Sequence, residues 1–592
     1  MYAAANMSAM RSGMRALIVG ALLLTFVVGN AGCFTTTPGE RFYGRVVIPQ
    51  EQHFRWSDGG LPQIFDPAFA ATPPDTDLVR AIFEGLTDYD PRTLAPVPAV
   101  ATRWESSNGG KTWTFYLRED ARWSDGVMVT AQDFVRSWER TARIGDLVPH
   151  TELLRNIEGA RKAPGHTPDK QSEQTAQPAA RPGGEPRFGA EALNDRILRV
   201  HLEQADENFP ALVAHPVFRP VRIADTEPGR RVGPRGIISN GAFTLSAAEP
   251  NRVVLERAKN YWAKSDVALE VVEFVGTSDA EAALAAYRAG EIDAVTNAAF
   301  EPLAIKLLAP YQDFRRETYG ALTYYSFNIA HSPFDDVRVR EALAIAIDRD
   351  RISEDDLGGS TEPARKFLPD EMDSTKETVV SKTEFLEKDV HRAKKLLAEA
   401  GFPDGRGFPR VRLLINRNEQ QRVVSQSIAA MWHTVLNIET DIIMRNWEEY
   451  EAVIRAGEYD VVRRGLVMQT TDELTNIRMM FQHERQTMPG TQQFGTPEGE
   501  VGKRGSGLSA ERPMESEEQA LSELKSMPIY FASSYSLVKP YVRGFDANVL
   551  DVPSLKTVSI DANWKGPETA LGSWSPFIFR GSYPKALRMS AL

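Results

Sequence analysis

Apolar and polar residues alternate in two short segments of the first half of the chain. In residues 113–117 the large apolar side chains are Trp113, Phe115 and Leu117, and residues 197–202 follow the same rule. A period of two is typical of a β-strand with one face buried. We therefore predict a strand at each segment, with its apolar face packed in a core.

Helical spacing of apolar residues occurs in residues 336–347 and 390–400. The second stretch is followed by Gly401, with Pro403 beyond it, and this order is typical of a helix C-terminus. A further helix is predicted to begin near Ala131, after an N-cap residue. Strand and helix patterns alternate along the chain without a detectable repeat, which predicts an α/β fold.

Two segments lack this patterning. Residues 162–187 are rich in Pro, Gln, Gly and Ala, and residues 483–518 are polar and rich in Gly. Chains of such composition bury too little apolar surface to offset the entropy that they lose on ordering. We expect the first segment to be a disordered surface insertion and the second to be a loop.

The N-terminus has the organisation of an export signal. A basic stretch, an apolar run over residues 16–28 and two small residues precede Cys33. The run is shorter than the about 20 residues that span a bilayer. Residues 1–33 resemble a bacterial lipoprotein signal peptide, in which the Cys becomes the lipid-modified first residue, although Asn30 stands where that pattern has an aliphatic residue. An uncleaved signal anchor or an ordinary secreted protein is the alternative.

Composition and charge exclude several classes of function. With 592 residues, of which 42% are hydrophobic and 25% charged, the chain is long enough for two or three soluble domains. Its formal net charge of -11 leaves no basic footprint for nucleic acid. Cys33 is the single cysteine, which excludes an intrachain disulfide and a cysteine-based metal site.

No motif for catalysis, for a cofactor or for a metal is present in the sequence. The 9 histidines are scattered without metal-ligand spacing, and His-Glu-x-x-His, Gly-x-Ser-x-Gly and P-loop patterns do not occur. We therefore expect a protein that is not an enzyme and that uses no cofactor and no metal.

Sequence blocks in a fixed order extend over most of the chain. The densest one runs from Val100 to Trp138 and contains Lys111-Thr-Trp-Thr-Phe-Tyr-Leu-Arg118 and Trp123-Ser-Asp-Gly126. Further blocks are Phe83-Glu-Gly-Leu86, Ser239-Asn-Gly-Ala-Phe-Thr-Leu245, Tyr287-Arg-Ala-Gly-Glu-Ile-Asp293, Pro333-Phe-Asp-Asp-Val-Arg-Val-Arg340 and Leu537-Val-Lys-Pro-Tyr541. From about Asp66 to Trp564 the chain resembles the family 5 extracellular solute-binding proteins, the oligopeptide- and dipeptide-binding components of ABC importers.

The resemblance implies a periplasmic-binding-protein fold with two lobes, three domains and a ligand cleft at the lobe interface. Domain I would combine residues 34–88, 195–263 and 534–592, domain II would be residues 89–194, and domain III residues 264–533. The lobes would close about a hinge at crossovers near residues 263 and 533. The resemblance also implies a monomer in the periplasm or cell envelope. Its lipid anchor on Cys33 would hold it to a membrane, where it would pass a peptide or similar solute to ABC importer permease subunits.

A set of ligand-binding residues follows from the same resemblance. Arg463 would pair with a ligand carboxylate, and Gly465 and Val467 would offer main-chain hydrogen bonds. Trp447 either stacks on a ligand side chain or belongs to a core or lobe interface. The full set is Ala71, Thr72, Pro73, Asn240, Gly241, Trp447, Arg463, Gly465, Val467, Gln469 and Asp472.

Gln469 is the main departure from the family pattern. Peptide-binding members carry an Asp at this place, which pairs with the free amino group of the peptide, whereas Gln469 has no charge. A buried ammonium without a partner is costly, so either Asp472 takes over the role or the ligand has a blocked or modified end. A sugar-containing or other non-peptide solute, a loss of tight binding, and a receptor or scaffold role are the alternatives.

Overall fold

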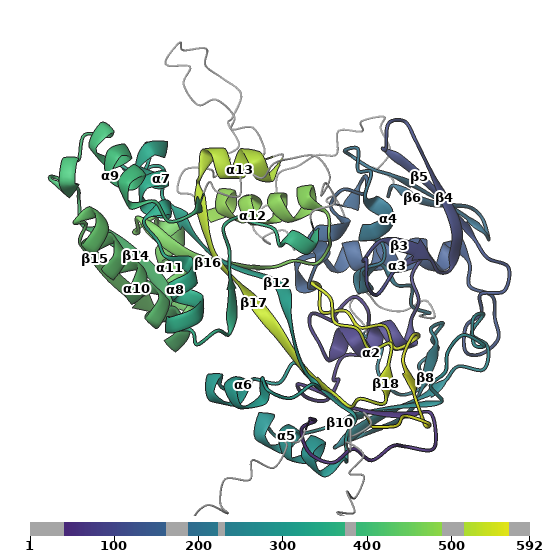
Figure 1. The fold of residues 1–592 in the computed structure, drawn as a ribbon. Coiled ribbons are helices and arrows are strands. Elements are labelled where there is room, and N and C mark those ends of the chain that lie inside the picture. Colours follow the sequence, from purple (N-terminus) through teal and green to yellow (C-terminus); the bar gives the residue numbers. More distant parts are fainter. Residues whose placement is uncertain are drawn as a thin grey trace, which may run out of the picture.

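The computed structural model describes residues 41–160, 188–222, 231–372, 386–487, 514 and 516–566. The described chain forms an α/β fold with two lobes (Figure 1). The signal segment with Cys33, the insertion at residues 162–187 and residues 567–592 lie outside the described residues. Within the described part, no helix combines the length and the apolar character needed to cross a membrane.

One large sheet of 11 strands passes through both lobes. Its strand order is β15-β14-β16-β12-β17-β11-β1-β10-β9-β8, and β13 pairs with β17 outside this path. The strands are β1 (His53–Asp58), β8 (Phe243–Glu249), β9 (Arg252–Arg257), β10 (Val271–Val275), β11 (Ala294–Thr296), β12 (Phe314–Phe327), β13 (Thr361–Pro363), β14 (Val411–Asn416), β15 (Thr440–Arg445), β16 (Val461–Val467) and β17 (Ser526–Val538).

A second sheet has 4 strands in the order β4-β5-β7-β6. They are β4 (Ala101–Ser107), β5 (Thr112–Leu117), β6 (Ala190–Asn194) and β7 (Ile197–His201). Two further sheets have two strands each: β2 (Thr87–Tyr89) pairs with β3 (Pro96–Pro98), and β18 (Val542–Arg543) pairs with β19 (Ser559–Ile560). Both strands predicted from alternation are confirmed as β5 and β7, which pair with each other. Trp113, Phe115 and Leu117 are all buried on one face of β5, as expected.

Helices cover the sheets. They are α2 (Asp75–Ile82), α3 (Ala131–Ile144), α4 (Phe209–Leu212), α5 (Ala280–Ala289), α6 (Pro302–Leu308), α7 (Val337–Ile345), α8 (Arg349–Arg351), α9 (Val390–Glu399), α10 (Glu419–Leu436), α11 (Trp447–Ala456), α12 (Glu473–Thr487) and α13 (Glu517–Glu523). The three predicted helices are confirmed as α3, α7 and α9. At the start of α3, Thr130 and Asp133 form a capping box, which satisfies backbone N–H groups of the first turn.

The expectation of a loop over residues 483–518 is wrong at both ends of that segment. Helix α12 continues to Thr487 and α13 begins at Glu517, while residues 488–513 lie outside the described residues. The ends were misassigned because a helix that begins in an apolar stretch, here with Ile477 and Met480, continues into polar residues that carry no apolar period of their own.

The N-terminal lobe holds β1, β8–β11, the second sheet and helices α2–α6, and the C-terminal lobe holds β13–β16 and helices α7–α13 (Figure 1). Each lobe has its own apolar core, with Trp56 and Trp138 buried in the first and Trp432 in the second. A third apolar cluster, which we call the interlobe cluster, joins residues of both lobes. Its members include Tyr89, Ala214, Leu322, Met468, Ile477 and Val549.

Strands β12 and β17 carry the chain between the lobes (Figure 1). The sequence placed the first crossover near residue 263 and assigned residues 264–533 to one domain. Instead, β10 pairs in parallel with β1, and β11 pairs with β1 and with the end of β17, so these strands belong to the N-terminal lobe. The boundary was misplaced because the pairing of β10 with β1 joins segments far apart in the sequence.

The pairing of β12 with β17 is irregular at the point where both strands pass between the lobes. Thr318 faces Ser533, but Leu322 faces Phe531, so the register shifts across Gly320. A Cβ on Gly320 would lie only 3.1 Å from the carbonyl oxygen of Val549, so a larger residue would crowd this contact. We call this region, residues 318–322 and 531–534, the lobe junction.

Candidate functional site

Strand β16 presents an open edge at the interface between the lobes. One side of β16 pairs with β12 from Val461 to Val467, whereas its other side pairs with β14 only at Val461 and Val462. Among the described residues, Arg463 to Val467 therefore have no strand on that second side. Such an edge can add the backbone of an extended chain as a further strand.

The backbone groups on this edge are identified by their partners. The hydroxyl of Tyr450 donates to the carbonyl oxygen of Arg463, and Nε2 of Gln469 donates to the carbonyl oxygen of Val467 at 3.1 Å. N–H and C=O groups of a strand alternate in direction from one residue to the next. Gly465, midway between those residues and exposed, thus directs its own N–H and C=O away from β12.

Arg463 lies over the same strand. Its Nη2 donates to Oγ1 of Thr323 at 3.2 Å, and a Cβ on Gly465 would lie 3.2 Å from this guanidinium nitrogen. The absence of a side chain at Gly465 therefore provides the space that the guanidinium of Arg463 occupies. No described carboxylate forms an ion pair with Arg463, and its Nε is buried without a partner. The guanidinium of Arg463 is thus held in place at the open edge of β16, where it can bind a carboxylate.

Gln469 forms a hydrogen bond across the lobe interface. Its Oε1 lies 3.1 Å from Nε2 of His215, a fully buried residue of the N-terminal lobe. Nδ1 of His215 accepts from the backbone N–H of Val217 at 3.2 Å, so Nε2 carries the proton. Burial, followed by the neighbouring His150 and Arg80, lowers the pKa of His215 well below its usual range. The ring is therefore neutral, and the corner at Gln469 has no charge.

A second histidine extends this contact to the segment before α2. The rings of His150 and His215 meet edge to face with centroids 5.1 Å apart, and Nε2 of His150 lies 2.9 Å from the carbonyl oxygen of Ala71. Ala71 and Gln469, both predicted site residues, are thus brought together through two histidines. Sequence reasoning missed His150 and His215, because histidines so far apart in the chain carry no local signal.

Asp472 is fully engaged in the structure. Oδ1 accepts from Nδ2 of Asn208 at 2.5 Å, across the lobe interface, and Oδ2 accepts from the backbone N–H of Thr475 in the first turn of α12 at 2.7 Å. A cavity of about 250 Å³ lies beside it, between the lobes. Burial, followed by the nearby Asp472, raises the pKa of Asp206 in the cavity wall to about 6.

Asn240 and Gly241 hold the C-terminal end of α2. Both polar atoms of the Asn240 side chain bind the backbone of Glu84, each at 3.0 Å, and the N–H of Gly241 donates to the carbonyl oxygen of Ile82 at 2.8 Å. A Cβ on Gly241 would lie 2.5 Å from the carbonyl carbon of Ile82. These contacts fix the orientation of the Asn240 side chain on the backbone of Glu84.

The remaining predicted residues lie at the surface of the interface. Trp447 begins α11 with 65% of its surface exposed and stacks on Tyr450, with ring centroids 5.6 Å apart. It is therefore not a core residue, and Tyr450 connects it to the backbone of Arg463. Thr72 and Pro73 directly precede α2, and Thr72 is exposed.

The sequence profile of the bacterial extracellular solute-binding proteins, family 5, matches residues 95–487. The chain belongs to this family. Proteins that it resembles include the periplasmic oligopeptide-binding protein of Escherichia coli (strain K12), 29% identical over 550 residues, which are 90% of this chain and 95% of that one. A probable deoxycholate-binding periplasmic protein of the same organism is 27% identical over 505 residues, covering 84% and 91% of the two chains.

A solved family 5 structure has the same fold. It is the unliganded open form of a periplasmic murein tripeptide binding protein, with a TM-score of 0.68 and 26% sequence identity over 87% of this chain and 98% of the other. The two-lobed binding-protein fold expected from the sequence is thereby confirmed. The relatives are binding proteins by name, and none of the named ones is an enzyme.

Proposed function

We propose that this family 5 protein captures peptides between its two lobes and delivers them to the permease subunits of an ABC importer. The observation that carries the proposal is the open edge of β16 at the lobe interface, from Arg463 to Val467. A peptide that pairs with this edge is held through its backbone, so its side chains are free to vary. Similarity to an oligopeptide-binding protein supports the same function.

Arg463 is the residue that recognises the peptide carboxylate. Its guanidinium is held beside Thr323, and no described carboxylate neutralises it. Hydrogen bonds to charged groups contribute about 1.5–3 kcal/mol. Loss of the carboxylate or of the guanidinium should therefore weaken binding by roughly 10- to 150-fold.

The other end of the bound solute lacks a free ammonium group. Gln469 and the neutral His215 form an uncharged corner, and both oxygens of Asp472 already accept hydrogen bonds. An ammonium group placed there would lose its hydration without gaining an anionic partner. A peptide with a blocked or modified amino end fits this corner, as does an uncharged group of a non-peptide solute.

Calorimetric titration with one peptide in four forms tests both ends. The forms combine a free or acetylated amino end with a free or amidated carboxyl end. Amidation should weaken binding to the wild type by the factor given above and should leave binding to Arg463→Ala unchanged. Acetylation should not weaken binding to the wild type, and Gln469→Asp should shift the preference toward the free amine.

Arg410→Ala is the matched control, because Arg410 forms an exposed ion pair with Asp441 on the outer strands of the sheet. Its affinity for all four peptides should equal that of the wild type. If amidation weakens binding to Arg463→Ala as much as to the wild type, Arg463 does not recognise the carboxylate. If none of the four peptides binds the wild type, while native mass spectrometry of the purified protein shows a co-purified solute of another class, the peptide function is wrong.

We also propose that the protein works as a monomer without catalytic activity, held to a membrane of the cell envelope by a lipid on Cys33. The order of basic, apolar and small residues before Cys33 supports the anchor. Two acyl chains are enough for stable attachment to a bilayer. The protein would then meet the permease by diffusion along the membrane surface.

A further inference from the structure

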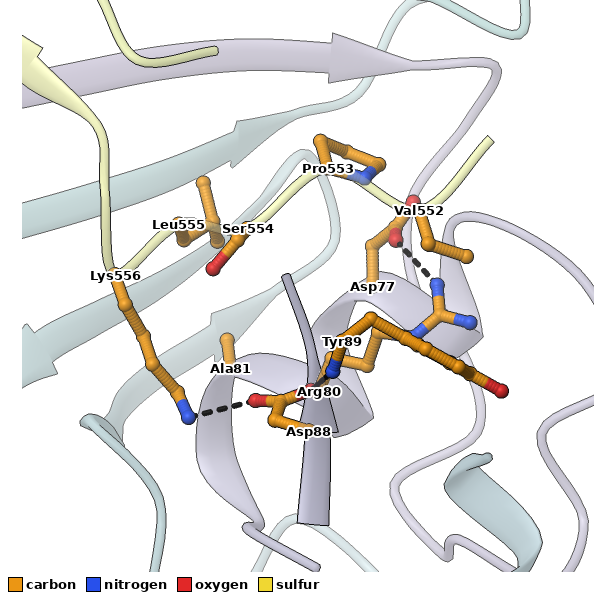
Figure 2. Close-up of a pocket in the computed structure, with 10 residues that line it drawn as sticks. All are labelled: Asp77, Arg80, Ala81, Asp88, Tyr89, Val552, Pro553, Ser554, Leu555 and Lys556. Atoms are coloured by element: carbon orange, nitrogen blue, oxygen red, sulfur yellow. Dashed lines mark hydrogen bonds and ion pairs between the residues drawn. The ribbon is translucent and has the colours of Figure 1, made fainter. Parts of the chain in front are cut away.

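Two aspartates meet in the core of the N-terminal lobe. Asp58 ends β1, Asp77 lies in the first turn of α2, and both are almost completely buried. Oδ1 of Asp58 accepts from Oγ1 of Thr296 at 2.7 Å and from Nδ2 of Asn297 at 2.6 Å. Oδ1 of Asp77 accepts from Nη1 of Arg80 at 3.3 Å, a contact drawn in Figure 2.

The second oxygens of the two carboxyl groups have no donor. Oδ2 of Asp58 and Oδ2 of Asp77 are buried and lack a hydrogen-bond partner among the described groups, although the two side chains lie within hydrogen-bonding reach of each other. Two carboxylates cannot hydrogen-bond unless one of them carries a proton. A facing pair without a proton would place two negative charges together in a dry environment.

The charged neighbours compensate at most one of the two negative charges. On α2, Arg80 is the one cation in contact with it, and the segment after β18 brings a third acid, Asp551, whose Oδ1 accepts from Oγ of Ser534 at 3.0 Å. From β12, Tyr319 faces the same group of acids. On β2, the carboxylate of Asp88 is paired with Lys556 and Arg219, and Tyr89 is buried.

The surroundings raise the pKa of each of these groups. Burial, followed by the negative charge of Asp58, raises the pKa of Asp77 well above its usual range, and burial also raises the pKa of Asp58. Burial and then Asp58 raise the pKa of Asp551 to about 6. Burial and then Asp551 raise the pKa of Tyr319 to about 12, so the tyrosine stays neutral.

One member of this group of acids, Asp551, is attached to the lobe junction. Ser534 of β17, which binds Asp551, and Tyr319 of β12 both lie where the register of the two strands shifts. Two residues before Asp551, the carbonyl oxygen of Val549 accepts from the N–H of Gly320 at 2.7 Å. A change in charge at Asp58 and Asp77 therefore acts on the segment and the strands about which the lobes turn.

We propose that Asp58 and Asp77 share one proton, and that loss of this proton loosens the lobe junction so that the lobes separate as the pH rises. With the proton in place, an O–H···O⁻ hydrogen bond joins β1 to α2, and such bonds are short and strong. Without it, two buried anions repel each other, and water must enter to solvate them. The inference does not depend on which solute binds.

The variant Asp77→Asn tests the proposal. Its amide supplies a permanent N–H donor to Asp58 and has no proton to lose. For the wild type without solute, small-angle X-ray scattering from pH 5 to pH 10 should show a radius of gyration that increases with pH. In Asp77→Asn the radius should stay at its low-pH value. Asp88→Asn is the matched control, because Lys556 and Arg219 lower the pKa of Asp88 to about 2 despite its burial, and that group does not titrate in this range.

Infrared spectroscopy reports the shared proton directly, even in a variant that is less stable. The difference spectrum of the wild type minus Asp77→Asn at pH 7 should contain the C=O stretching band of a buried protonated carboxyl group, and so should that of the wild type minus Asp58→Asn. Taking differences removes the bands of other buried acids whose pKa is raised, such as Asp551 and Glu517. The proposal is overturned if neither difference spectrum contains the band, or if Asp77→Asn expands with pH as the wild type does.

Discussion

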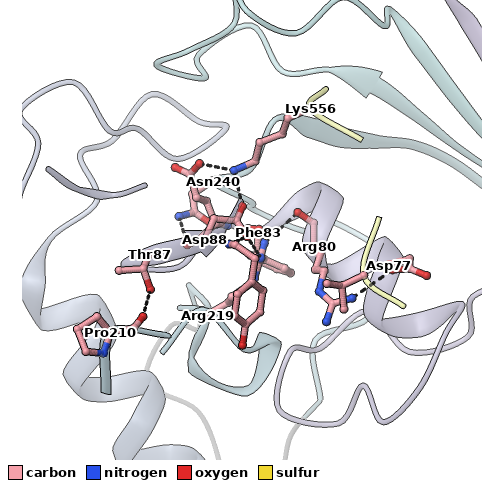
Figure 3. A network of polar contacts seen from close by, with 12 residues as sticks. Asp77, Arg80, Phe83, Thr87, Asp88, Pro210, Arg219, Asn240 and Lys556 are labelled. Carbon is pink, nitrogen blue, oxygen red and sulfur yellow. Dashed lines mark hydrogen bonds and ion pairs between the residues drawn. The ribbon is translucent and has the colours of Figure 1, made fainter. Parts of the chain in front are cut away.

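Replacement of Lys556 should lower the stability of the protein by an amount that its contacts define. Its Nζ donates to Oε1 of Glu84 at 2.8 Å. It also donates to Oδ2 of Asp88 at 2.7 Å (Figures 2 and 3). The Glu84 side chain is fully buried, and 18% of the Asp88 side chain is exposed. The ammonium thus joins the segment after β18 to α2 and β2. Lys556→Met keeps the length of the side chain and removes the charge.

The expected loss of stability in Lys556→Met follows from the charges that remain. Removing one partner of a buried ion pair costs about 3–5 kcal/mol, because the other charge is left without compensation. The two carboxylates still have other partners: Tyr261 and Trp262 donate to Glu84, and Arg219 donates to Asp88 at 3.1 Å. We therefore expect Lys556→Met to lower the free energy of unfolding of the N-terminal lobe by about 3 kcal/mol, the lower end of that range.

The pH dependence of stability gives a second measure of the same contacts, through the pKa of Asp88. Despite burial, Lys556 and then Arg219 lower the pKa of Asp88 from 3.8 to about 2, a difference that corresponds to about 2.4 kcal/mol. Because the folded pKa is the lower one, this stabilisation is fully present above the unfolded pKa and is lost as the pH falls through about 2. In Lys556→Met most of this acid-dependent loss should disappear, because burial, the largest influence on Asp88, then opposes the remaining effects of Arg219 and of the Tyr89 backbone N–H.

Urea unfolding from pH 2 to pH 7, monitored by tryptophan fluorescence, measures both quantities. Lys556→Arg is the matched control, because it keeps the charge and should unfold within about 1 kcal/mol of the wild type. The reasoning fails if Lys556→Met at pH 7 is as stable as Lys556→Arg. It also fails if the acid limb of the stability curve is the same for Lys556→Met and for the wild type.

Two further predictions concern residues that the sequence and the structure interpret differently. Gly241→Ala should lower thermal stability by about 1–3 kcal/mol, because the new Cβ would overpack against the backbone of α2. Gly233→Ala is the control, since a Cβ there meets no atom within 4 Å and should not lower the stability. Equal melting temperatures of the two variants would contradict the role of Gly241 in packing. His215 should stay neutral from pH 5 to pH 8 with the proton on Nε2, which nitrogen chemical shifts measured by NMR report. A midpoint of titration within that range would show that the Gln469 corner carries a charge.

The elements that the sequence predicted are those with a local signal. Alternation in β5 and helical spacing in α7 and α9 involve residues a few positions apart, and a buried face imposes such a period on the sequence. The assignment of β10 to the wrong lobe has the opposite cause. A hydrophobic strand has the same pattern in either lobe, and only its pairing with β1 decides between them.

The candidate site was predictable to the extent that it lies on one strand. The pattern of the relatives pointed to Arg463, Gly465 and Val467, and the structure places all three on the open edge of β16. His215, which binds Gln469 from a position 254 residues away, could not be found in this way. Asn240, which the pattern of the relatives placed in a ligand loop, binds the backbone of Glu84, a contact that the sequence did not predict.

The open edge of β16 also bears on the solubility of the protein. A strand with unpaired backbone groups accepts any extended chain, including the same strand of a second molecule, and such edges nucleate aggregation. Arg463 and Arg464 are adjacent in β16 and project to opposite faces of the sheet, so two molecules that joined edge to edge would bring like charges together. Replacing both arginines would therefore threaten the colloidal stability of the protein as well as the proposed recognition of the solute.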